Sequence, residues 1–417
     1  MNDETSISMT PAGARRQAGF TLAEMLVSLA VTVILLLGIL ATFDLNGRVA
    51  RVQTNVADMQ QSLRIVQDDV VRLVRMSGRG GLPLTDSPSS LLPSGPALMV
   101  RDNVPAGQYM IAGNTDTKIL EGTDVLTVRG VFTTLFQVNA SGALTLTPAN
   151  NPTTGTVVVQ DVTPGGVKQD LQPLKDANGK SEAILLVSTL GDETHAVVEL
   201  ASVTNGANSV TLNFKVTSGS MTDYYKKLSS GGSFPSALRN VVYLGIVEEY
   251  RYYVREEHVI AADPSSDLAP KLARARFYPG TDQLYNADKV DLADNILNLQ
   301  IALGFDSSIG GARKDDADNT GTDDQILETA TGQNDDWLYN GVGDNAGDAA
   351  FQAGPALQYL RLTTLARTDR RDPQYQAPVL PDRIEDRQLP ANDPLRTYAS
   401  RMFRWRTLQT TVDLRNL

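Results

Sequence analysis

The sequence predicts an α+β protein in which one long N-terminal helix packs on an antiparallel β-sheet, with an additional β-rich insertion. Three observations predict this class. An apolar stretch at residues 20–43 passes without a break into a segment with a 3.5-residue apolar repeat, which indicates one continuous helix. Beyond residue 82, short apolar or alternating runs are separated by Gly, Pro, Asn and Asp, as is typical of antiparallel strands.

The composition of the 417-residue chain excludes several classes of function. A net charge of −11 argues against nucleic acid as a direct partner, because phosphate binding needs a basic face. The absence of Cys excludes disulfides, thiolate metal sites and Cys nucleophiles. The chain has only two histidines, His195 and His258, which argues against a zinc site with several His ligands and gives few candidates for a Ser-His-Asp triad. No catalytic constellation is visible, so we expect a protein that is not an enzyme and needs no organic cofactor.

Residues 20–43 have the character of a membrane-spanning helix, because Glu24 is their only charge. At about 1.5 Å per residue the segment would span roughly 36 Å, enough for a hydrocarbon core of about 30 Å. Arg15 and Arg16 favour a cytoplasmic position for the preceding residues. A secretory signal peptide would have a shorter apolar run that ends in a small-residue cleavage site, and this segment has neither feature.

Glu24 needs its own explanation, since a carboxylate at the centre of a membrane helix costs about 2.5–3.5 kcal/mol. If the chain were cut after Gly19, the new α-amino group of Phe20 would lie one helical turn from Glu24. A cation at the start of another subunit's helix could then neutralise the carboxylate. The alternative is a carboxylate that reaches the lipid headgroups.

The hexapeptide Gly19-Phe20-Thr21-Leu22-Ala23-Glu24, after a short basic leader and before the apolar run, resembles a class III prepilin signal. The resemblance implies that residues 1–19 are a leader, removed after Gly19 by a prepilin peptidase, and that an N-methyltransferase methylates Phe20. It also implies that Glu24 helps to dock the subunit into a helical filament. The protein would then be a single-pass inner-membrane protein with a periplasmic head, and would reach the cell surface when assembled in a pilus.

Residues 44–76 are expected to form the amphipathic half of the same helix. Asp68 and Arg72 have the spacing for an ion pair, the apolar face widens at Ile65, and the Ser-Gly sequence after residue 76 ends the helix. Such a narrow apolar stripe fits either a parallel coiled coil or a helix that lies against its own sheet, and the prepilin signal favours the second. The stripe consists of Leu45, Val49, Val52, Val56, Met59, Leu63, Val66, Val70 and Leu73, and Val71 and Val74 also widen it.

We expect a β-rich insertion or head region at residues 77–240 and a C-terminal pilin-like β-sheet region at residues 241–417. Neither region shows an internal repeat or the alternation of strands and helices of a parallel sheet. Expected strands are residues 125–128, 135–138, 156–159, 183–187, 196–200, 210–216, 241–256, 274–278, 292–300, 358–367 and 403–414, and apolar residues alternate from Leu299 through Ile301 and Leu303 to Phe305.

Residues 292–306, 358–367 and 401–417 are similar to the C-terminal part of PilW-type minor pilins, and residues 59–81 are similar to the helix end of the same family. This similarity implies a subunit that helps to prime type IV pilus assembly, with other minor and major pilins as partners in a tip complex. A type II secretion pseudopilin shares the signal and the helix. A membrane-anchored periplasmic adhesin or binding protein, a tethered enzyme and a coiled-coil receptor are further alternatives.

The acidic loop at residues 306–348 contains the one candidate metal site. Asp316, Asp318, Thr320 and Asp324 offer hard oxygen ligands around a turn-forming glycine, as at the start of an EF-hand loop, and would suit Ca²⁺. The fit is partial, because Thr320 stands where Asp or Asn is usual and Leu327 stands where the bidentate Glu would be. The alternative is a solvated acidic loop without a metal.

Overall fold

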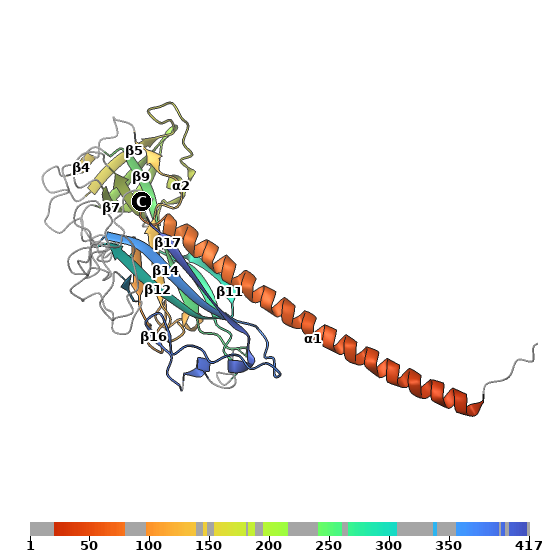
Figure 1. Ribbon diagram of the computed structural model, residues 1–417. Coiled ribbons are helices and arrows are strands. Elements are labelled where there is room, and N and C mark those ends of the chain that lie inside the picture. The colour runs from red at the N-terminus through yellow and green to blue at the C-terminus, as the bar shows by residue number, and fades with distance from the viewer. Residues whose placement is uncertain are drawn as a thin grey trace, which may run out of the picture. The chain divides into compact units, whose positions relative to one another are not determined.

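The computed structural model describes residues 21–79, 97–138, 145–147, 154–180, 182–187, 195–215, 241–260, 266–306, 337–339, 356–391, 393–396 and 400–414. The chain divides into two compact units, Met1–Asn55 and Val56–Leu417. A long N-terminal helix is followed by antiparallel sheets, so the predicted α+β class is confirmed (Figure 1).

Helix α1 runs without interruption from Leu22 to Arg75. Its first part, up to Arg51, has exposed side chains throughout, and the helix is long and apolar enough to cross a membrane. The helix ends where the sequence predicts, because Gly78 takes the left-handed conformation (φ 71°) that stops a helix. The amide of Gly78 then donates to the Arg129 carbonyl, which ties the helix end to a strand.

The larger sheet has eleven strands, and every pairing within it is antiparallel. Its main path is β1-β2-β9-β6-β7-β8-β5-β4, while β10 pairs with β9 and β11, and β3 pairs with β9. The strands are β1 (Leu98–Arg101), β2 (Val125–Gly130), β3 (Phe136–Gln137), β4 (Thr145–Thr147), β5 (Thr154–Gln160), β6 (Ala183–Val187), β7 (His195–Asn205), β8 (Ser209–Lys215), β9 (Tyr243–Arg255), β10 (Lys271–Phe277) and β11 (Leu284–Asp294).

A second antiparallel sheet has the order β13-β12-β14-β17, and β15 and β16 form a separate hairpin. Its strands are β12 (Ile296–Asp306), β13 (Trp337–Leu338), β14 (Ala356–Arg367) and β17 (Trp405–Asp413), and the hairpin strands are β15 (Arg383–Ile384) and β16 (Arg387–Gln388). The short helices are α2 (Gln172–Asp176) and the 3-10 turns Thr115–Thr117, Pro394–Arg396 and Ser400–Met402.

Strand β9 connects two parts of the larger sheet. Its first half, residues 243–247, pairs with β6 and β3, whereas residues 248–255 pair with β2 and β10. A separate apolar core is formed by buried residues of strands β5 to β8 and their neighbours, and it includes Val157, Leu212 and Phe214. The boundary expected at residue 240 stays a prediction, although β9 hydrogen-bonds to strands on both sides of it in the sequence.

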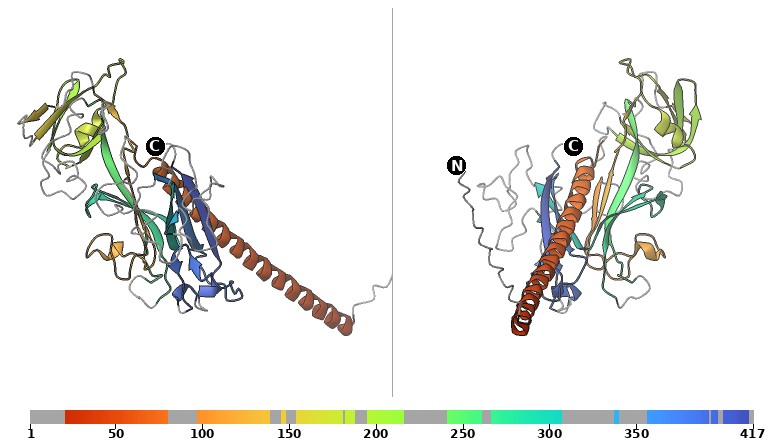
Figure 2. Two further views of the ribbon diagram at one scale, coloured as in Figure 1. Left: turned by 60° about the vertical axis from the view of Figure 1, so that its left-hand side comes forward. Right: turned by 90° about the vertical axis from the view of Figure 1, so that its right-hand side faces the viewer.

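The compact unit Val56–Leu417 is called the head from here on. The part of α1 that belongs to the head contributes to the core that both sheets share. Met59, Leu63, Val66, Val70, Leu73 and Val74 are buried in one cluster with residues of β1, β2, β9 and β10 and of β12, β14 and β17. Figure 2 shows strands on both sides of this part of the helix. The apolar stripe therefore packs against the protein's own sheets from Met59 onwards, as a pilin-like helix would.

Two details of this helix differ from expectation. Ile65 is 44% exposed, so the apolar face widens on the side of Val74, which is fully buried, and not towards Ile65. Arg72 pairs with Asp69 and not with Asp68 (Nη2–Oδ1 2.9 Å). Asp69 is favoured because it also accepts hydrogen bonds from Tyr252 Oη (2.8 Å) and Arg274 Nη1 (2.8 Å) in the larger sheet. This carboxylate fixes the rotation of the helix against β9 and β10.

The single strand expected at residues 292–300 is two strands. Asn295 adopts a left-handed conformation (φ 58°), which asparagine tolerates better than most residues, and it separates β11 from β12. The chain thereby leaves the larger sheet and enters the second one within a single residue. The alternation predicted beyond this point is confirmed for Leu299, Ile301 and Leu303, which are fully buried; the side chain of Phe305 lies outside the described residues.

A buried ion cluster lies on the β2–β9 ladder. Glu249 is fully buried, and its carboxylate contacts Arg129 Nε (2.6 Å), Arg251 Nη2 (2.6 Å) and the Gly280 amide (2.7 Å). Burial opposes ionisation, but the two guanidiniums and the amide hold the pKa of Glu249 below its usual range. Because each charge is compensated, the cluster can remain in the interior.

The shared core gives a direct mutational test. Leu63→Ala should lower the free energy of unfolding by about 3 kcal/mol, because it leaves a cavity between the helix and both sheets. Ile65→Ala, two residues away on the exposed side, should cost less than about 1 kcal/mol. Urea unfolding of the full chain in detergent would measure both values. Equal losses for the two variants would contradict the packing described.

Candidate functional site

The candidate site for processing and assembly is the start of α1. Gly19 and Phe20 lie outside the described residues. Glu24 lies in the first turn of the helix, and Thr21 directly precedes that turn. The structure therefore describes one of the three residues that the sequence singles out here.

Thr21 and Glu24 form a reciprocal capping box. The Thr21 amide and hydroxyl both donate to Glu24 Oε2 (2.9 and 3.0 Å), and the Glu24 amide donates to Thr21 Oγ1 (3.2 Å). These bonds satisfy amides that the first turn of a helix leaves without intrahelical partners. They also keep one carboxylate oxygen near the N-terminal end of the helix. The T-x-x-E spacing that signals this cap is visible in the sequence, although the sequence-based interpretation of Glu24 concerns its charge and its docking role and does not include the cap.

The four proposed calcium ligands, Asp316, Asp318, Thr320 and Asp324, lie outside the described residues. Within the part of the chain that the structure describes, no three His, Cys, Asp or Glu side chains are arranged to hold a metal ion. The calcium hypothesis therefore stays a prediction.

A cluster of three carboxyl groups lies inside the head, and no sequence motif predicts it. Asp124 is fully buried and accepts from the amides of Asn103 (2.9 Å) and Ile301 (2.7 Å). Asp386 accepts from the side chain of Asn103 (2.7 Å), and Asp102 interacts electrostatically with both carboxyl groups. These groups come from the β1–β2 connection and from the β15–β16 turn, so only the folded chain brings them together.

Both burial and mutual repulsion affect the protonation of this cluster. Burial, followed by the charge of Asp102, raises the pKa of Asp124 well above its ordinary value, although two backbone amides oppose the shift. Burial also raises the pKa of Asp102. The cluster therefore retains protons at a pH where exposed carboxyl groups have lost them.

Comparison with known proteins bears on the N-terminal end. Residues 14–40 match the family described as the prokaryotic N-terminal methylation motif, and this range includes the expected cleavage position after Gly19 and the first part of α1. No curated protein and no solved structure is significantly similar to the chain. The chain therefore carries a motif consistent with a prepilin-type signal. This match supports a type IV pilin-like or pseudopilin-like protein.

The carboxyl cluster predicts a specific pH dependence. A group whose pKa is raised by folding stabilises the fold below its unfolded pKa, and this stabilisation is lost as the pH rises through the folded value. Asp102→Asn removes one such group and the repulsion on Asp124, so it should raise the free energy of unfolding by about 1 kcal/mol at pH 8. At pH 4 the gain should disappear. Urea titrations at both pH values measure this difference.

The matched control is Asp116→Asn, because Asp116 is exposed on the same β1–β2 connection. Its stability should equal that of the parent chain at both pH values. An Asp102→Asn variant that is less stable than the parent at pH 8 would contradict the repulsion in the cluster.

Proposed function

We propose that this chain is a PilW-like minor pilin of a bacterial type IV pilus that helps to prime assembly within a tip complex. The observation that supports this function best is the methylation motif at residues 14–40, continued by one helix from Leu22 to Arg75 that ends inside a large β-rich head. The similarity of residues 292–306 and 358–367 to PilW-type minor pilins supports the subtype, and these segments include the end of β11, all of β12 and most of β14.

The size of the head supports a position at the tip. The compact unit Val56–Leu417 would have to be repeated at each step of a filament if the chain were a shaft subunit. Such bulky heads would collide with their neighbours along a closely spaced helical array. A single copy at the end of the filament avoids this constraint.

In this proposal the segment from residue 20 to 43 anchors the protein in the inner membrane, and the head is periplasmic until assembly carries it to the cell surface. The partners are a prepilin peptidase with N-methyltransferase activity and other minor and major pilins. The protein acts as a structural subunit and not as an enzyme. A type II secretion pseudopilin is the second candidate, because the same motif and helix would serve it equally well.

The mature N-terminus tests the proposed processing. Mass spectrometry of the protein from its native membrane should find a chain that begins at Phe20 with one added methyl group, because cleavage after Gly19 creates that amine. An N-terminus at Met1, or one created by a cut beyond Ala41, would contradict the proposal.

Substitutions at Glu24 separate its charge from its capping role. Glu24→Ala should be processed normally but should fail to enter pili, since the carboxylate that docks the subunit is lost. Glu24→Gln keeps a side chain that can complete the capping box but has no charge. Immunoblots of sheared pilus fractions should therefore show strong losses for both variants. Normal incorporation of Glu24→Gln would show that capping alone matters and would contradict the docking role.

We also propose that the acidic loop binds Ca²⁺ through Asp316, Asp318, Thr320 and Asp324, with a dissociation constant in the submillimolar to millimolar range of extracellular sites. Calcium should then raise the melting temperature of the parent chain, and Mg²⁺ should not replace it. The double variant Asp316→Ala, Asp318→Ala should abolish the calcium effect while its melting temperature in EDTA stays unchanged. A calcium effect that survives in this variant would exclude these ligands.

A further inference from the structure

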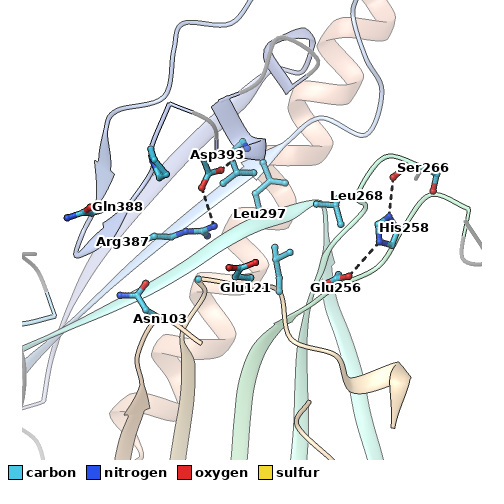
Figure 3. A pocket seen from close by; sticks show the side chains of 14 residues that line it. Asn103, Glu121, Glu256, His258, Ser266, Leu268, Leu297, Arg387, Gln388 and Asp393 are labelled. Carbon is cyan, nitrogen blue, oxygen red and sulfur yellow. Dashed lines mark hydrogen bonds and ion pairs between the residues drawn. The ribbon is translucent and has the colours of Figure 1, made fainter. Parts of the chain in front are cut away.

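A pocket of about 750 Å³ lies within the unit Val56–Leu417 (Figure 3). Its walls come from the β1–β2 connection, the β9–β10 connection, the first residues of β12, and the segment at residues 387–395. The volume is in the range of pockets that hold small molecules or short peptide segments. Neither the membrane anchor nor the carboxyl cluster accounts for it.

Apolar side chains form much of the pocket wall. Leu297 lies at the start of β12, and Leu268 comes from the segment that leads into β10 (Figure 3). The apolar residues in the lining are Leu120, Leu268, Leu297, Pro390 and Leu395. Such a wall can cover the methylene groups of a ligand, at about 0.8 kcal/mol for each buried CH₂.

The charges in the lining are mostly negative. Glu121, Glu256 and Asp393 contribute three carboxylates, and Arg387 contributes the one guanidinium (Figure 3). Glu256 pairs with Lys118 outside the lining, and Asp393 accepts from the Leu395 amide (2.8 Å). Among the described residues, Glu121 has no cationic partner within ion-pair distance.

Arg387 is held as part of the pocket wall. Its Nη1 donates to Asn298 Oδ1 (3.0 Å), and its Nη2 lies 4.0 Å from Asp393 Oδ2. The guanidinium also packs on Gly122, where a Cβ would lie 2.8 Å from Arg387 Nε and where φ is +68°. Only glycine suits that position, because any side chain would both collide and be strained. Arg387 is thus a fixed structural cation beside Asp393, and Glu121 is the carboxylate of the lining that remains to meet a ligand.

The histidine in the lining does not form a nucleophilic triad with its neighbours. His258 Nδ1 lies 3.1 Å from the Ser266 carbonyl oxygen, whereas the Ser266 hydroxyl is engaged with the backbone of Ile260. His258 Nε2 lies 3.6 Å from Glu256. A serine nucleophile would need a hydrogen bond between its hydroxyl and the imidazole. This arrangement therefore favours ligand binding over acyl transfer.

We propose that this pocket binds a short basic segment of another protein, with a Lys or Arg side chain as its anchor. The ammonium or guanidinium would pair with Glu121, while its methylene groups lie against the leucine wall. Anions are disfavoured because the lining carboxylate without a cationic partner at ion-pair distance, Glu121, would repel them. The described carboxylates do not form a metal-binding group. The proposal is independent of the role in pilus assembly, because it rests only on the pocket.

Three capped tripeptides test the proposal on the full chain in detergent micelles: acetyl-Gly-Lys-Gly-amide, its norleucine analogue and its glutamate analogue. The lysine peptide should bind saturably with a dissociation constant in the millimolar range. The norleucine analogue, which has the aliphatic chain without the charge, should bind at least threefold more weakly. The glutamate analogue should bind the most weakly of the three. NMR titration of the peptide signals measures all three affinities.

Glu121→Gln identifies the site, since this exposed residue can change without loss of the fold. The variant should weaken the lysine peptide about threefold to fivefold, the effect of one partly exposed ion pair, and should leave the norleucine affinity unchanged. Asp116→Asn, an exposed acid on the same connection, should change neither. Equal binding of all three peptides, no saturable binding, or an unchanged lysine affinity in Glu121→Gln would each overturn the proposal. Unaltered melting temperatures confirm that the variants are folded.

Discussion

The head depends on the burial of one helical face between two sheets. The face from Met59 to Val74 contributes to a core with strands of both the eleven-stranded and the four-stranded sheet. Helix residues lie within the same apolar cluster as residues of both sheets, so the helix covers part of the inner face of each. The helix that supplies this face is continuous with the apolar segment near the N-terminus. One helix therefore provides both a segment apolar enough to cross a membrane and part of the hydrophobic core. This dual use explains why the apolar repeat continues past residue 43.

Polar contacts then determine how the elements are aligned. Asp69 binds Tyr252 and Arg274 and so sets the rotation of the helix, which the apolar stripe alone would leave loosely defined. Glu249 holds Arg129 and Arg251 together across β2 and β9. At Asn295 the left-handed backbone transfers the chain from one sheet to the other. These few positions give specificity to a fold whose stability comes mainly from apolar burial.

Much of the fold could be predicted from the sequence because its signals are periodic. The apolar run at residues 20–43 and the 3.5-residue repeat after it predict one continuous helix, which the structure describes from Leu22 to Arg75, and alternation predicts most of the long strands. The break at Asn295 was missed, because apolar residues continue on both sides of it and only the backbone conformation marks it. At the functional site, the prepilin-type signal can be predicted because it is local, whereas the capping box between Thr21 and Glu24 is established only by the hydrogen bonds in the structure. The carboxyl cluster and the pocket combine residues far apart in the chain, such as Asp124 with Asp386. No local sequence pattern therefore predicts the cluster or the pocket.

If the helix is the common core of both sheets, its head-proximal half should open only when the whole head unfolds. Native-state hydrogen exchange of the full chain in detergent, followed by mass spectrometry, measures this opening along the sequence. We expect the amides of residues 63–74, of β9 and of β14 to exchange with one common free energy, and added urea should lower all three in parallel. Exchange of residues 63–74 at a clearly lower free energy, while β9 and β14 stay protected, would contradict a core shared by the helix and both sheets.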